Sequence, residues 1–156
     1  MTIDISKYME EARRRAEKGE YEPCSSYIGA MRRKAHEAGI ILTEEQEGEA
    51  QTILRTAAEK QVPIHFREAE RGSLEAEKAA QQGNRVKVAA AWDYVASCLA
   101  ALRSSVRETG ITLTAEEEAT AQCLELRCQA AKEKRELGAY PRGGSSTPAG
   151  NRRAFR

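Results

Sequence analysis

Two stretches decide the fold: AGIILTEEQEGEAQ, from Ala38 to Gln51, and TGITLTAEEEATAQ, from Thr109 to Gln122. When Gly39 is aligned with Gly110, the two stretches lie 71 residues apart in the chain. Self-similarity at a fixed offset is typical of a duplicated structural unit. The identical pairs are Gly39/Gly110, Ile40/Ile111, Leu42/Leu113, Thr43/Thr114, Glu45/Glu116, Glu47/Glu118, Ala50/Ala121 and Gln51/Gln122.

Each stretch predicts the end of one helix and the start of the next. Glycine adopts the left-handed conformation that closes a helix, and the isoleucine that follows it can fold back onto the last turn. Thr43 and Gln46, like Thr114 and Glu117, have the spacing of a capping box. The acidic residues that follow each threonine suit the positive end of the helix dipole.

The same offset continues upstream as a pair of matched apolar stripes, whose members recur at intervals of 4, 3 and 4 residues in both copies. This spacing indicates one face of a helix, because a strand would alternate every second residue. The stripes consist of Cys24, Ile28, Met31 and Ala35 in the first copy and of Val95, Leu99, Leu102 and Val106 in the second.

Reading outward from these anchors predicts an all-α protein of about six helices, a tandem duplication of a three-helix unit in a bundle or short helical array. We expect helical repeat 1 over residues 1–62, helical repeat 2 over 63–137, packed together as one domain, and a flexible tail over 138–156. The expected helices are Ser6–Lys18, Tyr21–Ala38, Glu44–Gln61, Phe66–Gln82, Arg85–Thr109 and Ala115–Glu136. Pro63 predicts the break between the copies, since proline removes a donor and disfavours the helical conformation of Val62.

Composition narrows the function classes. The 156 residues carry 25 Lys and Arg against 24 Asp and Glu, which gives a net charge of +1. A net charge this small does not attract nucleic acid or a membrane to the molecule as a whole. No stretch reaches the roughly 20 apolar residues of a membrane span, so we expect a soluble, cytoplasmic protein. Its four cysteines fall within predicted helices and form no Cys-x-x-Cys pair. They predict free thiols, and we predict no metal or other cofactor and no small-molecule substrate.

Two places are candidates for contact with a partner. The second middle helix is apolar on more than one face around Trp92 and Tyr94, so it lies inside the bundle or meets another chain, which includes a second copy. The tail has no acidic residue and carries Arg142, Arg152, Arg153, Phe155 and Arg156, a composition suited to phosphate contact and base stacking.

A basic cluster of Arg32, Arg33, Lys34 and His36 invites a ribonuclease interpretation, but cations at a helix C-terminus, favoured by the dipole, explain it as well. The stretch Gly19-Glu20-Tyr21, with Cys24 and Ile28, resembles part of a tetratricopeptide unit. The 34-residue period of that family is absent, and general packing of helix hairpins accounts for the same pattern.

These observations favour a non-enzymatic interaction protein, an adaptor or assembly component that binds a protein partner through its repeat surfaces. The first alternative is a protein associated with RNA or DNA through its basic C-terminal arm. The second is an enzyme with a site between the repeats, although the sequence holds no nucleophile elbow and no phosphate-binding loop.

Overall fold

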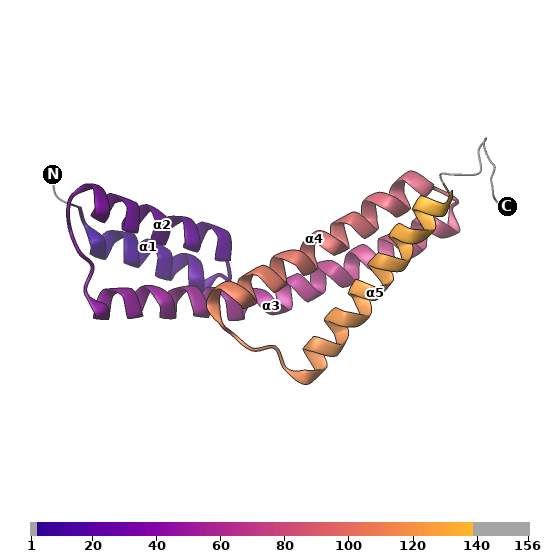
Figure 1. The fold of residues 1–156 in the computed structure, drawn as a ribbon. Helices are drawn as coiled ribbons and strands as arrows, with labels where there is room; N and C mark the ends of the chain where they lie inside the picture. The colour runs from indigo at the N-terminus through magenta and orange to yellow at the C-terminus, as the bar shows by residue number, and fades with distance from the viewer. Residues whose placement is uncertain (1–2, 139–156) are drawn as a thin grey trace. The chain divides into compact units, whose positions relative to one another are not determined.

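The computed structural model describes residues 3–138, and these residues form helices and connecting turns without any strand. The helices are α1 (Ile5–Glu17), α2 (Tyr21–Glu37), α3 (Glu44–Gln81), α4 (Arg85–Thr109) and α5 (Ala115–Gly138) (Figure 1). The all-α prediction is confirmed. Within the described part of the chain, no helix has the length and apolar character that a membrane span requires.

The chain divides into two compact units, which are described separately. The first unit contains α1, α2, the part of α3 up to residue 67, and residues 100–114. The second contains residues 68–99, which include the rest of α3 and α4 up to Leu99, together with α5 from residue 115. Both α3 and α4 therefore contribute to each unit.

The predicted helix ends are confirmed at Gly39 and Gly110, which adopt φ angles of 72° and 75°. Gly39 closes α2 in a Schellman motif, because its amide donates to His36 at 3.1 Å and the amide of Ile40 donates to Ala35 at 2.8 Å. Gly110 closes α4 with a single bond of 2.8 Å to the carbonyl of Val106. The two glycines thus share a conformation but end their helices with different bonds.

Thr43 begins α3 with the predicted capping box. Its amide donates to Gln46 Oε1 at 2.9 Å, and its hydroxyl accepts from the amide of Gln46 at 3.0 Å. Two helix-terminal groups are satisfied by one pair of side chains, which fixes where α3 starts.

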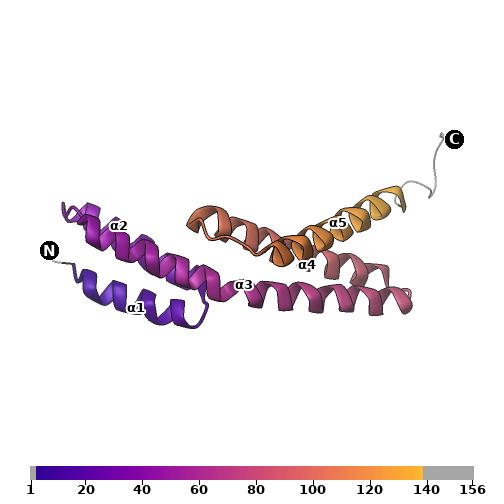
Figure 2. The same ribbon diagram turned by 90° about the horizontal axis from the view of Figure 1, so that it is seen from below.

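In the first unit, α1 and α2 form an antiparallel hairpin against the first part of α3 (Figures 1 and 2). The predicted stripe of Cys24, Ile28, Met31 and Ala35 is fully buried. The turn between α1 and α2 approaches α3 closely, since a Cβ on Gly19 would lie 3.3 Å from the carbonyl oxygen of Lys60. The ammonium group of Lys60 donates to the carbonyl of Glu17 at 3.2 Å, which joins α3 to the end of α1.

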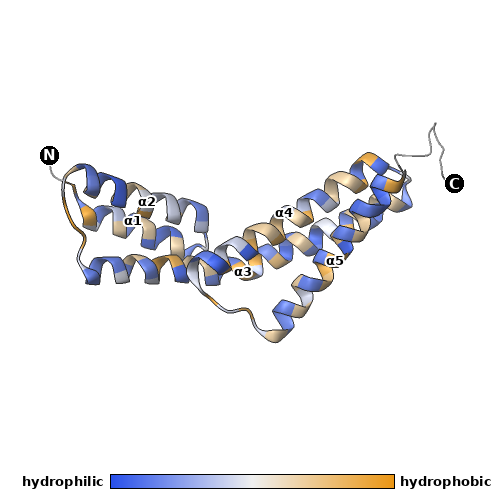
Figure 3. Ribbon diagram, viewed as in Figure 1, coloured by the Kyte–Doolittle hydropathy of each residue, from blue (hydrophilic) through white to orange (hydrophobic). Residues whose placement is uncertain are grey.

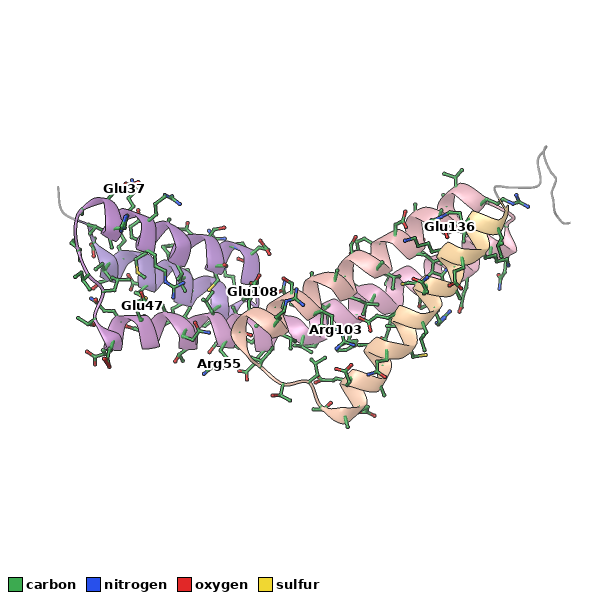
Figure 4. The ribbon with its side chains drawn as sticks, viewed as in Figure 1. Glu37, Glu47, Arg55, Arg103, Glu108 and Glu136 are labelled. Carbon is green, nitrogen blue, oxygen red and sulfur yellow. The ribbon has the colours of Figure 1, made fainter. Side chains whose placement is uncertain are left out.

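The last turns of α4 belong to this first unit and are held there by polar contacts. The hydroxyl of buried Tyr21 donates to Glu108 Oε1 at 2.8 Å. Arg55 on α3 donates from Nε to the carbonyl of Thr109 at 3.4 Å; Glu108 and Arg55 are labelled in Figure 4. Burial of Tyr21 and its bond to Glu108 both raise the pKa of the phenol, so it remains a donor at neutral pH.

In the second unit, α3 and α4 approach each other most closely at Gly72. A Cβ built on Gly72 would lie 2.7 Å from Val95 Cγ2 and 3.2 Å from Tyr94 Cδ2. Val95 and Leu99, two members of the second predicted stripe, are buried, as are Ala121 and Leu124 of α5. The absence of a side chain at Gly72 therefore allows the two backbones to pack against each other.

The predicted helix break at Val62 and Pro63 is wrong, because α3 runs without interruption from Glu44 to Gln81 with Pro63 inside it. The described residues consequently hold five helices where six were expected. Pro63 is exposed, so water can satisfy the carbonyl group that has lost its amide partner. A continuous buried stripe runs past it at intervals of 4, 3 and 4, formed by Ala58, Val62, His65 and Ala69. Burial of that stripe outweighs the cost of the proline, about 3 kcal/mol in a helix interior.

Candidate protein-interaction surface

The basic cluster predicted from the sequence lies at the end of α2, with all four members exposed. Arg32 forms an ion pair with Glu47 at 2.8 Å and so connects α2 to the first turns of α3; Glu47 is labelled in Figure 4. Arg33, Lys34 and His36 occupy the last turns of the helix, where the dipole favours positive charge. One member of the cluster is therefore engaged in holding the first unit together.

Tyr94, a predicted partner-binding residue, is 43% exposed on α4. Its hydroxyl donates to Glu68 Oε1 at 2.5 Å, and Arg71 forms an ion pair with the same oxygen at 2.5 Å. The bond to the Glu68 carboxylate is the main reason that the pKa of Tyr94 is raised. Tyr94 is thus partly exposed, while its hydroxyl links α4 to α3.

Trp92, the second predicted partner-binding residue of α4, is half-buried beneath an arginine of α5. The guanidinium carbon of Arg127 lies 5.0 Å from the centre of the indole ring, within the range of a cation–π interaction. Arg127 also pairs with Glu77 at 2.7 Å, and the thiol of Cys128 donates to the carbonyl of Trp92 at 3.8 Å. Trp92 therefore takes part in packing within the second unit, and its contacts are separate from those of Tyr94.

The other predicted partner-binding residues belong to the C-terminal arm. Arg142, Arg152, Arg153, Phe155 and Arg156 lie outside the described residues.

An exposed apolar face on α5, which the sequence analysis did not single out, is the clearest candidate surface. We define the outer face of α5 as six positions spaced alternately 4 and 3 residues apart. Leu126 is 71% exposed and Leu137 is 72% exposed, whereas Ala121 and Leu124 on the other side of the helix are buried. Apolar residues of α5 stand between hydrophilic ones along its length in Figure 3. The outer face consists of Ala119, Cys123, Leu126, Ala130, Glu133 and Leu137.

The surroundings of Leu126 distinguish it from an isolated exposed leucine. Residues three and four positions away share a helix face, and for Leu126 these are Gln122, Cys123, Gln129 and Ala130, all uncharged. Leu74 on α3 is exposed to a similar extent, 64%, but its corresponding neighbours are Glu70, Arg71, Glu77 and Lys78. Leu126 thus lies in an uncharged stretch of the outer face of α5, whose one charged member is Glu133, whereas Leu74 lies among charged residues.

A signal for this face was present in the sequence. The positions from Ala119 to Leu137 repeat with the seven-residue period of a coiled-coil seam. The widest apolar surface that the sequence predicts is instead that of the second middle helix, around Trp92 and Tyr94. On that helix Ala90, Ala96, Ala100 and Ala101 are indeed exposed, but they are small and offer little area.

The ionisation of the buried and half-buried thiols fits a role in packing. All four cysteines are free thiols. Burial raises the pKa of Cys24 to about 11, and burial is also the first cause of the raised pKa values of Cys98 and Cys128. A thiol with a raised pKa stays protonated at neutral pH and is a weak nucleophile.

His65 is buried and its pKa is lowered by burial, so its imidazole is neutral. No group of three or more His, Cys, Asp or Glu side chains in residues 3–138 is arranged to hold a metal ion.

Comparisons with known proteins add no relative: no family model matches the chain, and neither the curated proteins nor the solved structures include a significant match.

Proposed function

We propose that this chain is a non-enzymatic helical interaction protein, an adaptor or assembly component, and that its partner is a protein bound on the outer face of α5. The observation that carries the proposal is the pair of exposed leucines, Leu126 and Leu137, on one seam of regular spacing. A helix with a second apolar seam gains stability when that seam is covered by another helix.

The arrangement of the second unit supports this assignment. The other side of α5 is held by Ala121 and Leu124 in the core and by the contacts of Arg127 and Cys128 with Trp92. These contacts attach α5 to the second unit by its opposite side and leave the outer face exposed to a partner. The raised pKa values of the buried thiols fit a structural role for these cysteines.

The same proposal includes the duplicated architecture. Two Gly-Ile-x-Leu-Thr junctions, each with a left-handed glycine, support a tandem origin from one helical unit. The first stripe, which starts at Cys24, is buried, and so are Val95, Leu99 and Leu102 of the second, which supports it further. In this proposal the second copy has acquired the partner surface, because the first copy has no exposed leucine at the matching positions Gly48, Thr52 and Arg55.

A photo-crosslinking experiment in cells that naturally produce the chain tests the proposal. A benzoylphenylalanine is placed at position 126 in one variant and at position 74 in a second, the control, since Leu74 has similar exposure but charged neighbours. We expect a protein adduct of defined mass from position 126 and none from position 74. Equal adduct yields from both positions, or no adduct from position 126, would contradict the proposed function.

A further inference from the structure

The outer face of α5 has the pattern of a two-helix coiled-coil seam. Its members follow intervals of 4, 3, 4, 3 and 4 residues, which are the a and d positions of a heptad repeat. Apolar or small residues occupy every one of these positions except Glu133. From Ala119 to Leu137 the seam has a length of roughly 27 Å, at 1.5 Å per residue. A partner helix of comparable length can therefore pack along it.

The seam is complementary to itself when the second helix runs in the opposite direction. With a two-fold axis beside residue 128, Leu126 faces Ala130 of the second copy, and Ala119 faces Leu137. Each large residue then meets a small one, which is the arrangement that allows two surfaces to interdigitate without voids. A two-fold axis also closes the assembly as a dimer, because the same patch is used on both chains.

The opposite, parallel orientation is disfavoured by the same residues. It would place Glu133 against Glu133 across the seam, a like-charge pair, and would set Leu126 against Leu126 and Ala130 against Ala130. In the antiparallel orientation Glu133 faces Cys123, which carries no like charge. Gln129 already donates to Glu133 at 3.2 Å within its own helix.

Beside the seam, the antiparallel pair sets charged residues against uncharged ones, with Arg127 as the exception. Gln122 and Gln129 border it on one side and are uncharged, so Glu136 meets Gln122 of the second copy. On the other side Arg127 approaches its own copy near the axis. Its charge is balanced within each chain by Glu77, at 2.7 Å.

We propose that the partner of the outer face of α5 is the same face of a second copy of this chain, packed antiparallel around Leu126 and Ala130. This inference rests on the proposed function and identifies its partner. The chain is then one half of a symmetric homodimer.

The oligomeric state of the purified full chain is the first test. Size-exclusion chromatography with light scattering is expected to give twice the chain mass of 17.2 kDa in the micromolar range. Leu126→Lys should shift the mass to that of one chain with an unchanged circular dichroism spectrum, and Leu74→Lys should leave the dimer intact. A wild-type monomer throughout this range, or a Leu126→Lys variant that stays dimeric, would overturn the inference.

Disulfide trapping tests the orientation and does not depend on disrupting the interface. In Glu133→Cys, the new thiol faces Cys123 of the second copy, so oxidation should give a covalent dimer on non-reducing gels. Adding Cys123→Ser should abolish that dimer. A covalent dimer that persists in the double variant, or a wild-type dimer linked through Cys123 itself, shows the parallel orientation and overturns the proposal.

The two proposals fail separately. A monomeric wild-type chain together with an adduct of a different protein at position 126 overturns self-association and supports the proposed function. A monomeric chain without any adduct at that position overturns both.

Discussion

Replacing Gly72 with alanine is expected to destabilise the second unit, although alanine is the better helix former. The added Cβ would lie 2.7 Å from Val95 Cγ2, whereas carbon atoms in contact are about 3.5–4.0 Å apart. Val95 has no exposed surface, so its methyl group cannot turn into solvent. Tyr94 Cδ2, at 3.2 Å, limits relief in the other direction. The helices α3 and α4 must therefore move apart to accept the methyl group.

Two opposing effects set the magnitude. Alanine in place of glycine within a helix stabilises it by roughly 0.5–1 kcal/mol. Forcing an extra carbon into a packed helix contact costs about 1–3 kcal/mol. The expected net change for Gly72→Ala is a loss of up to about 2 kcal/mol in the free energy of unfolding, because the steric cost exceeds the propensity gain.

Gly48→Ala is the matched control, since Gly48 lies in the same helix and a Cβ there would meet nothing within 4 Å. This variant should gain roughly 0.5–1 kcal/mol. Denaturant unfolding followed by circular dichroism measures both variants, with midpoints taken for the transition of the unit that carries each substitution. If Gly72→Ala proves as stable as Gly48→Ala, the close approach of α3 and α4 is wrong.

Three further predictions concern the continuity of α3 at Pro63, the buried His65 and the C-terminal arm. Pro63→Ala should raise the free energy of unfolding by about 1–3 kcal/mol because α3 continues through this position; an unchanged or lower value in denaturant unfolding would indicate a break there. Burial lowers the pKa of His65 below its ordinary 6.5, so protonation favours the unfolded chain, and stability that is complete above pH 6.5 is lost as the pH falls through the lowered pKa. His65→Leu should flatten the dependence of the melting temperature on pH between about 7 and 5. If the basic arm binds nucleic acid, deleting residues 139–156 should abolish a salt-sensitive affinity for RNA or DNA without loss of helicity, and retained affinity would contradict a role for the arm.

Where a helix ends by local chemistry, the sequence predicts it well. Gly39 needs only a left-handed conformation, and Thr43 needs only the side chain of Gln46 three residues later. The matched stripes could also be predicted from the sequence, because a spacing of 4, 3 and 4 residues depends on the helical period alone. All four stripe residues of α2 are buried, as are Val95, Leu99 and Leu102 of α4.

The continuity of α3 was missed because a local rule opposed a tertiary one. Pro63 disfavours a helix by its own backbone, and this local preference alone predicts a break. The stripe of Ala58, Val62, His65 and Ala69 remains in phase across the proline, which a broken helix would not require. The helical spacing of apolar residues through 58–69, like that of the middle helices, indicates one continuous helix.

The outer face of α5 shows why candidate sites are harder to predict than folds. An apolar seam identifies a buried face, but α5 has two seams, and the sequence does not say which one its own chain covers. Only the packing of Ala121 and Leu124 into the second unit leaves Leu126 and Leu137 exposed. Trp92 is the opposite case. It is a large aromatic residue and a candidate for partner contact, but it is in contact with Arg127 and Cys128 of its own chain. Because exposed apolar area is what a partner can still bury, the leucines of α5 are better candidates for contact than the tryptophan of α4.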